Sequence, residues 1–319
     1  MIQYIIRRML LVIPTIFIVS IVVFVSVRFL PGDIVELMLA EQGGLLRGTK
    51  AREHVEELLG LDVPAHVQYL RWVGGIVFHG SLGDSLTNAK TVTQLIGDRL
   101  PVTLELGALS MLVSLAIGIP IGIYSSIRQD TIGDYIGRSI AIVAISVPHF
   151  WLGIMVFLYP SIHFNWSPRV QYVGFFEDPM ANLGMMIIPA TILGLILSGQ
   201  VMRMMRTTML EVLRQDYVRT AYAKGLKQRV VINRHALKNA MIPVVTLIGI
   251  SLPFLIGGSL VIEQIFALPG LGRLMLTSLE ARDYTTVSGI NLVVALFVIL
   301  FNVVIDISYS WLDPRIRQQ

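Results

Sequence analysis

Six long apolar stretches constrain this chain more than any other feature of its sequence. Each has few charged residues and contains roughly eighteen residues or more, which is enough for an α-helix to cross a bilayer. The stretches are Met9–Val27, Val102–Ile127, Ile140–Tyr159, Leu183–Val201, Met241–Phe266 and Val287–Trp311. Only 14% of all residues are charged, whereas a soluble domain has about 25%. The sequence therefore predicts an all-α polytopic membrane protein with six transmembrane helices.

The polar segments divide the chain into three predicted regions. Residues 1–29 hold an N-terminal segment and the first helix, which we interpret as an uncleaved signal anchor. Residues 30–100 are polar enough to form a small helical cap, with a helix expected over Ala51–Leu59, another after Pro64 and a turn at Gly80–Ser85. Residues 101–319 hold the other five helices and a polar loop at about 202–240.

Lysine and arginine in the short loops predict the orientation, because cytoplasmic loops of membrane proteins are enriched in both. With the N-terminus inside, the inner segments hold Arg7, Arg8, Arg128, Arg138, nine residues from Arg203 to Lys238, Arg315 and Arg317. The short outer loops hold only Arg169, Arg273 and Arg282. We therefore expect both termini and the 202–240 loop in the cytoplasm and the cap outside it.

Motifs for catalysis within the chain are missing from the sequence. It has no GxxxxGK[ST] phosphate-binding loop, no HExxH motif and no cysteine, and its six histidines lack the spacing of metal ligands. We therefore expect no enzyme activity, cofactor or metal in this chain. The two halves also show no inverted repeat of hydropathy, which weakens the case for an ion-coupled secondary transporter.

The stretch Asp216–Asn239 is strongly basic although it lies between two apolar stretches. A helix-compatible run, Thr220–Ala223, is followed by Gly225 and then by a second helical run over Val230–Ala240. One interpretation is a basic loop that holds anionic lipid headgroups. The other is a helix–glycine–helix unit that docks into a partner protein, since glycine permits both the bend and a close approach of the backbone. The pattern slightly favours docking.

Polar side chains inside the apolar stretches are candidates for a transport pathway, because ionisable residues are rare in the bilayer. The candidates are Glu105, His149, Ser198, Gln200, Glu263 and Asp306. Their alternative role is structural or in gating, through hydrogen bonds between helices or contact with water near a helix end. That alternative is the stronger one for Glu105, Glu263 and Asp306, whereas His149 is the best pathway candidate.

Motifs along nearly the whole chain resemble those of permease subunits of ATP-binding-cassette importers in the dipeptide, oligopeptide and nickel branch. In the basic stretch, Arg219–Ala221, Gly225 and His235–Ala240 resemble the family's cytoplasmic signature loop, although Arg219 and Thr220 differ from the general Glu-Ala-Ala opening. Further motifs are Leu30–Asp33, Leu59–Asp62, Gly80–Ser85, Leu100–Leu104, Phe150–Gly153, Pro269–Arg273, Ala281–Tyr284 and Leu312–Arg315.

This resemblance implies the type I importer permease fold, in a multi-pass protein of the cytoplasmic (inner) membrane of a prokaryote. It implies a coupling helix at Gly225 that docks on an ATPase subunit through Asp216, Arg219, Thr220, Ala221, Lys224, Gly225, Leu226 and His235. The implied partners are a second homologous permease, two ATPase subunits that bind ATP and Mg, an extracytoplasmic substrate-binding protein and membrane lipid. No nucleic acid is implied.

Peptides are the first expected substrate of such an importer, with nickel chelates, glutathione and oligosaccharides as alternatives. The rival outside this class is an ion-coupled secondary transporter that works alone, and a lipid-binding scaffold without transport is a third possibility. ATP dependence of uptake separates the importer from both.

Overall fold

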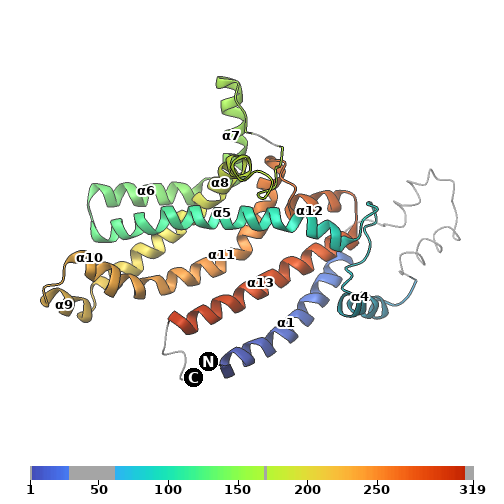
Figure 1. Cartoon of the computed structure of the whole chain (residues 1–319), viewed down its shortest axis with the longest axis horizontal. Coiled ribbons are helices and arrows are strands. Elements are labelled where there is room, and N and C mark those ends of the chain that lie inside the picture. Colours follow the sequence, from blue (N-terminus) through green and yellow to red (C-terminus); the bar gives the residue numbers. More distant parts are fainter. Residues whose placement is uncertain (1, 29–61, 169–170, 313–319) are drawn as a thin grey trace. The chain divides into compact units, whose positions relative to one another are not determined.

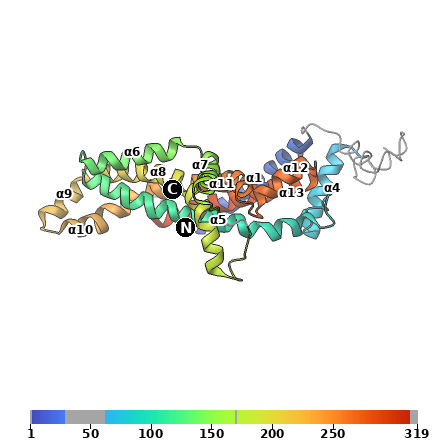
Figure 2. The same cartoon turned by 90° about the horizontal axis from the view of Figure 1, so that it is seen from above.

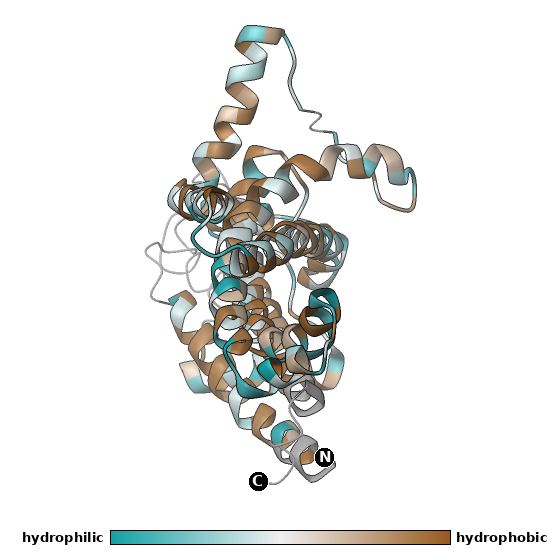
Figure 3. Ribbon diagram, turned by 90° about the vertical axis from the view of Figure 1, so that its left-hand side faces the viewer, coloured by the Kyte–Doolittle hydropathy of each residue, from teal (hydrophilic) through white to brown (hydrophobic). Residues whose placement is uncertain are grey.

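The computed structural model describes residues 2–28, 62–168 and 171–312, and the described chain is almost entirely helical (Figure 1). Five of its helices are long and apolar enough to cross a membrane, and a sixth span is formed if a sharply bent helix pair counts as one. Figure 3 shows hydrophobic residues distributed along the long helices. These findings confirm the prediction of a polytopic all-α protein.

The described chain contains twelve helical segments. They are α1 (Ile2–Arg28), α4 (Ala65–His79), α5 (Val92–Ile127), α6 (Ile132–Ser146), α7 (His149–Phe164), α8 (Pro179–Leu213), α9 (Asp216–Ala223), α10 (Gln228–Val230), the π-helix η1 (Val231–Ala236), α11 (Leu237–Ile265), α12 (Leu271–Glu280) and α13 (Tyr284–Leu312). Several helices extend beyond the apolar stretch that predicted them, because polar residues continue the helix past the apolar part.

The third predicted span, Ile140–Tyr159, is a sharply bent pair of helices rather than one straight helix. The chain bends by 92° between α6 and α7. Proline cannot donate a backbone hydrogen bond and disfavours the helical conformation of the residue before it. Accordingly Val147 is extended, with φ −85° and ψ 123°, and Pro148 precedes α7 as its N-cap. Pro120, Pro189, Pro243 and Pro253 instead lie inside helices that continue past them.

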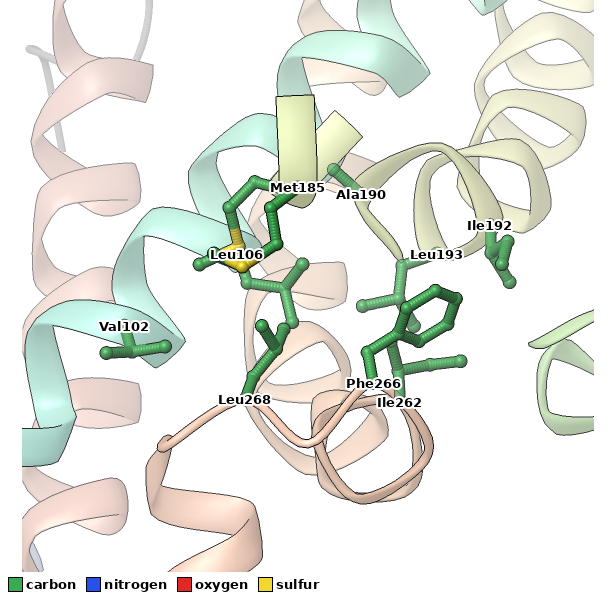
Figure 4. Packing of buried hydrophobic residues seen from close by; sticks show 10 residues of the cluster. Val102, Leu106, Met185, Ala190, Ile192, Leu193, Ile262, Phe266 and Leu268 are labelled. Atoms are coloured by element: carbon green, nitrogen blue, oxygen red, sulfur yellow. The ribbon is translucent and has the colours of Figure 1, made fainter. Parts of the chain in front are cut away.

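The described residues form two compact units. The first contains residues 100–273 together with both ends of the chain, and the second contains residues 10–99 and 274–297. In the first unit, Val102 and Leu106 of α5 pack with Met185 and Leu193 of α8 and with Phe266, which follows α11 (Figure 4). A second cluster joins α8 to α11 through residues that include Met205, Met209, Ala236, Ala240 and Val244.

Glycines bring α5 and α8 into backbone contact within the first unit. A Cβ atom added at Gly118 would lie 2.8 Å from the carbonyl oxygen of Ser198, and one at Gly194 would lie 2.7 Å from that of Ser110. Small residues at helix interfaces are typical of membrane proteins, in which close packing replaces the hydrophobic effect between helices. These two positions therefore fix the pairing of α5 with α8.

The second unit contains the described part of the predicted cap. Tyr69 and Trp72 of α4 pack against Phe24 of α1, and the hydroxyls of Ser20 and Tyr69 lie 2.8 Å apart. The turn predicted at Gly80–Ser85 is confirmed, since Gly80 and Gly83 have φ values of 62° and 94°. α4 follows Pro64 as predicted. The helix predicted over Ala51–Leu59 lies outside the described residues.

Replacing Gly118 by alanine is expected to destabilise the protein by about 1–3 kcal/mol, because the added methyl group overpacks the contact with α8. Gly107 lies on the same helix, and its Cβ would have no neighbour within 4 Å. Gly107→Ala is therefore the matched control and should be neutral or slightly stabilising. Thermal unfolding of both purified variants measures the difference, and equal midpoints would contradict the proposed backbone contact.

Candidate functional site

The basic stretch folds as a bent helix pair, as the sequence predicts. α8 ends at Leu213, α9 follows, and the chain turns at Gly225, whose φ is +77°. The Gly225 backbone N–H donates to the carbonyl oxygen of Tyr222 at 2.9 Å. From Gln228 the chain is helical again through α10 and η1 into α11. Figures 1 and 2 show α9 and α10 together beyond the ends of the α8 and α11 helices.

Apolar side chains on the inner face hold the pair in place. Val218 and Ala221 of α9 pack with Val231 of η1, and Val212 and Leu213 of α8 cover them. The side-chain amide of Asn239 also donates a hydrogen bond to the hydroxyl of Tyr217 at 2.8 Å. The helix pair is therefore attached to both α8 and α11.

The outer face carries large apolar side chains between cations. Tyr222, Leu226 and Val230 are 42%, 38% and 41% exposed. Exposed basic residues alternate with them along the chain, namely Arg219, Lys224, Lys227 and Arg229. We call these seven residues the coupling face. An exposed apolar patch with a charged rim is typical of a protein interaction site.

The residues predicted to dock on an ATPase divide between the two faces. Asp216, Arg219, Thr220, Lys224, Gly225 and Leu226 are exposed, and His235 is half-buried in η1. Arg219 and Asp216 form an exposed ion pair of 3.5 Å. Ala221 is only 5% exposed and packs against its own chain, so its observed role is to position α9.

Sequence analysis missed four of the seven residues of the coupling face, the basic Lys227 and Arg229 and the apolar Tyr222 and Val230. The apolar pair is the harder to predict, because an apolar residue in a short helix points inward more often than outward. Only the packing of Val218, Ala221 and Val231 shows which face of the pair remains open.

Glu263, a pathway candidate for which the sequence favours a structural or gating role, is fully buried within its own unit. Its Oε1 accepts hydrogen bonds from the hydroxyls of Thr103 (2.7 Å) and Ser259 (3.0 Å), and its Oε2 accepts one from the backbone N–H of Arg273 (3.1 Å). Thr103 in turn accepts a hydrogen bond from the backbone N–H of Leu271 at 2.8 Å. Glu263 thus binds the turn between α11 and α12 to α5.

Glu105 lies on α5 near the loop that precedes α8. The Tyr172 hydroxyl donates to Glu105 Oε2 at 3.5 Å, whereas Glu105 Oε1 and the buried Asn182 Oδ1 have no hydrogen-bond partner among the described residues. Burial, together with the Glu105 carboxylate, raises the pKa of Tyr172 above its ordinary value. The Tyr172 hydroxyl therefore remains protonated and can donate at neutral pH.

The other pathway candidates are dispersed. His149 is half-buried and begins α7 directly after the bend at Pro148. Ser198 is buried and its hydroxyl donates to the Leu195 carbonyl of its own helix at 2.6 Å, while Gln200 is half-buried on α8. The side chain of Asp306 lies outside the described residues. Within the described ranges, no group of three or more His, Cys, Asp or Glu residues is placed to hold a metal ion.

Two families match the sequence. Residues 118–318 match the family described as binding-protein-dependent transport system inner membrane component, and residues 1–107 match the family of the corresponding N-terminal membrane component.

The chain also has full-length relatives. It is 39% identical over 344 residues to a dipeptide transport system permease protein of Escherichia coli K12, with all of both chains covered. It is 41% identical over 313 residues to a putative peptide transport system permease protein of Brucella abortus, covering 98% of each. These relatives confirm the resemblance noted in the sequence.

Solved structures of transporters share the fold. An inward-facing structure of the MetNI methionine ABC transporter matches with a TM-score of 0.56 at 16% identity, covering 69% of this chain and 97% of that chain. An amino acid ABC transporter matches with a TM-score of 0.54 at 13% identity, covering 68% and 94%. At these identities the likeness concerns the fold alone, and it confirms the predicted importer permease fold.

Replacing Gly225 by valine is expected to destabilise the helix pair by about 1–2 kcal/mol, since a β-branched residue tolerates a positive φ poorly. No atom lies within 4 Å of the added Cβ, so the effect comes from the backbone alone. Gly225→Asn is the control, because asparagine adopts this conformation more readily. Amide hydrogen exchange over residues 216–236 should accelerate about tenfold in the valine variant only. Equal exchange in both variants would contradict the turn.

Replacing Glu263 by alanine is expected to cost about 2 kcal/mol or more, because two buried hydroxyls and one partly buried backbone N–H lose their acceptor. Glu280 is exposed on α12, and Glu280→Ala should change the unfolding free energy by less than about 0.5 kcal/mol. Thermal or denaturant unfolding of both purified variants tests this. A Glu263→Ala variant as stable as the natural protein would show that the turn does not depend on this carboxylate.

Proposed function

This chain belongs to the binding-protein-dependent transport system inner membrane components, and from that premise we propose that it forms half of the peptide pathway of an ATP-driven importer. The coupling face carries this proposal. It is exposed and apolar with a basic rim, and the packing beneath it connects it to α8 and α11. It is the part of the described chain best suited to receive a conformational change from another protein.

The proposed partner at this face is an ATPase subunit, one of two that bind ATP and Mg for the whole complex. The chain itself has no catalytic role in this proposal. A second homologous permease completes the pathway, and a substrate-binding protein delivers the substrate from outside. Both termini and the coupling face lie in the cytoplasm, which agrees with the excess of Lys and Arg in these segments.

Coupling requires that the ATPase bind the two conformations of the permease with different affinity. The helix pair can transmit such a difference because it is not attached by a flexible loop. Val212 and Leu213 pack on the pair at the end of α8, and the Thr208 hydroxyl donates to the Ala240 carbonyl of α11 at 3.0 Å. A movement of α9 therefore displaces both helices together.

Peptides are the proposed substrates, since the curated relatives are named as dipeptide, di/tripeptide and peptide permeases. Nickel chelates, glutathione and oligosaccharides remain the alternatives within the importer class. In the proposed pathway Glu105, His149, Ser198 and Gln200 are candidate lining residues. Glu263 contributes by positioning the turn between α11 and α12, because its carboxylate is enclosed by its own chain.

Leu226→Asp and Tyr222→Asp are expected to reduce ATP-dependent dipeptide uptake about tenfold or more, because a charge is placed in the centre of an apolar contact. Uptake and stimulated ATP hydrolysis are measured in proteoliposomes containing the complete transporter. Gln129→Asp adds the same charge at an exposed position in the α5–α6 loop and is the control. Membrane insertion and thermal stability should be unchanged in all three variants.

Two results would contradict the proposed function. One is uptake by this chain alone that follows a proton or sodium gradient, as a secondary transporter requires. The other is full ATP-coupled uptake in both aspartate variants, which would place the ATPase contact elsewhere.

A further inference from the structure

A cleft of about 140 Å³ lies between α6 and α8, away from the coupling face. Figures 1 and 2 show these two helices side by side. Three arginines line the cleft, Arg138, Arg203 and Arg206, and the rest of its lining is mainly apolar, including Ala141, Ile142 and Ile145. Nothing described so far uses it.

A buried carboxylate fixes one of the three arginines. The Arg206 guanidinium donates to both oxygens of Asp134 at 2.8 Å, and Asp134 is fully buried. Ser125 and the backbone N–H of Asp130 also donate to Asp134. A bidentate arginine held in this way keeps a defined orientation at the edge of the cleft.

The other two arginines retain capacity for an anion. Arg138 forms an ion pair with Asp134, whose Oδ1 lies 3.4 Å from Arg138 Nε, and its guanidinium lies over the Tyr135 ring, but the side chain as a whole is still 37% exposed. The Arg203 side chain is exposed and forms no ion pair within the described part of the chain. The three arginines carry three positive charges, and Asp130 and Asp134 carry two negative charges. A net charge of +1 therefore remains at the cleft.

Polar and apolar groups are separated along the helix axis. Arg138 lies six residues after the start of α6 and Ile145 thirteen residues after it, which correspond to about 9 Å and 20 Å of helix. The polar loop before α6 places the arginine end nearer the membrane surface and the isoleucine end deeper in the bilayer. Ile142 and Val143 are 64% and 60% exposed, and so they continue the apolar lining outward.

We propose that this cleft binds one anionic glycerophospholipid. The phosphate lies between Arg138 and Arg203, which both line the cleft and whose positive charges attract it, and an acyl chain lies over Ile142 and Ile145. A soluble phosphate would leave the apolar lining unused, and a zwitterionic lipid would not compensate the remaining positive charge. An anionic lipid satisfies both ends of the cleft.

Native mass spectrometry of the full-length chain tests this proposal with dioleoyl phosphatidylglycerol and dioleoyl phosphatidylcholine as probes. The natural protein should retain phosphatidylglycerol about tenfold more tightly than phosphatidylcholine. Arg203→Gln should remove most of this preference, since a charge-assisted hydrogen bond to phosphate is lost. Arg214 is exposed at the end of the same helix but outside the cleft, and Arg214→Gln should bind as the natural protein does.

Two further measurements separate the possible occupants. Ile142→Asn should weaken binding of phosphatidylglycerol severalfold while the thermal midpoint stays unchanged, because the acyl chain loses its apolar contact. Inorganic phosphate at millimolar concentration should not displace the lipid. Displacement by phosphate, equal binding of the two lipids, or an unchanged Arg203→Gln variant would each overturn the proposal. None of these outcomes bears on whether the coupling face receives an ATPase.

Discussion

In the hydrocarbon part of a membrane every backbone N–H and C=O group needs a hydrogen-bond partner within the protein. Helices meet this requirement internally, so the difficult places are those at which a helix stops. Between α11 and α12 the chain stops being helical, and Glu263 and Thr103 accept hydrogen bonds from the backbone N–H groups of Arg273 and Leu271. The buried carboxylate therefore supplies an acceptor that the backbone of this tight turn needs.

A second buried carboxylate in the first unit also accepts several hydrogen bonds. Asp134 is fully buried and accepts from Arg206, Ser125 and the Asp130 backbone, so that α5, α6 and α8 meet at one carboxylate. Burying a charge is costly unless it is paired and hydrogen-bonded. Asp134 meets both conditions, and it holds Arg206 in a defined orientation at the rim of the adjacent cleft.

The coupling face depends on the helices beneath it in a comparable way. Its exposed apolar residues belong to short helices, which would be unstable alone in water. Packing of Val218, Ala221 and Val231 against the end of α8 stabilises them, and Gly225 provides the turn. A surface intended to transmit movement needs this kind of rigid attachment. The proposed role in the importer rests on that mechanical continuity together with family membership.

The sequence by itself determined the helical membrane class, most helix positions and the glycine turn, because apolar length, loop charge and glycine conformation are local properties. It also located the basic stretch, and most of the residues that it singled out there are exposed. It could not determine the 92° bend at Pro148, because Pro120 and Pro189 are accommodated inside continuous helices. Only the tertiary structure decided that Ala221 faces inward while Tyr222 faces outward, and that Glu263 meets Thr103 160 positions away. Such pairings depend on how helices pack against one another. The periodicity of a helix shows which of its faces is apolar, but it does not show which other helix packs against that face.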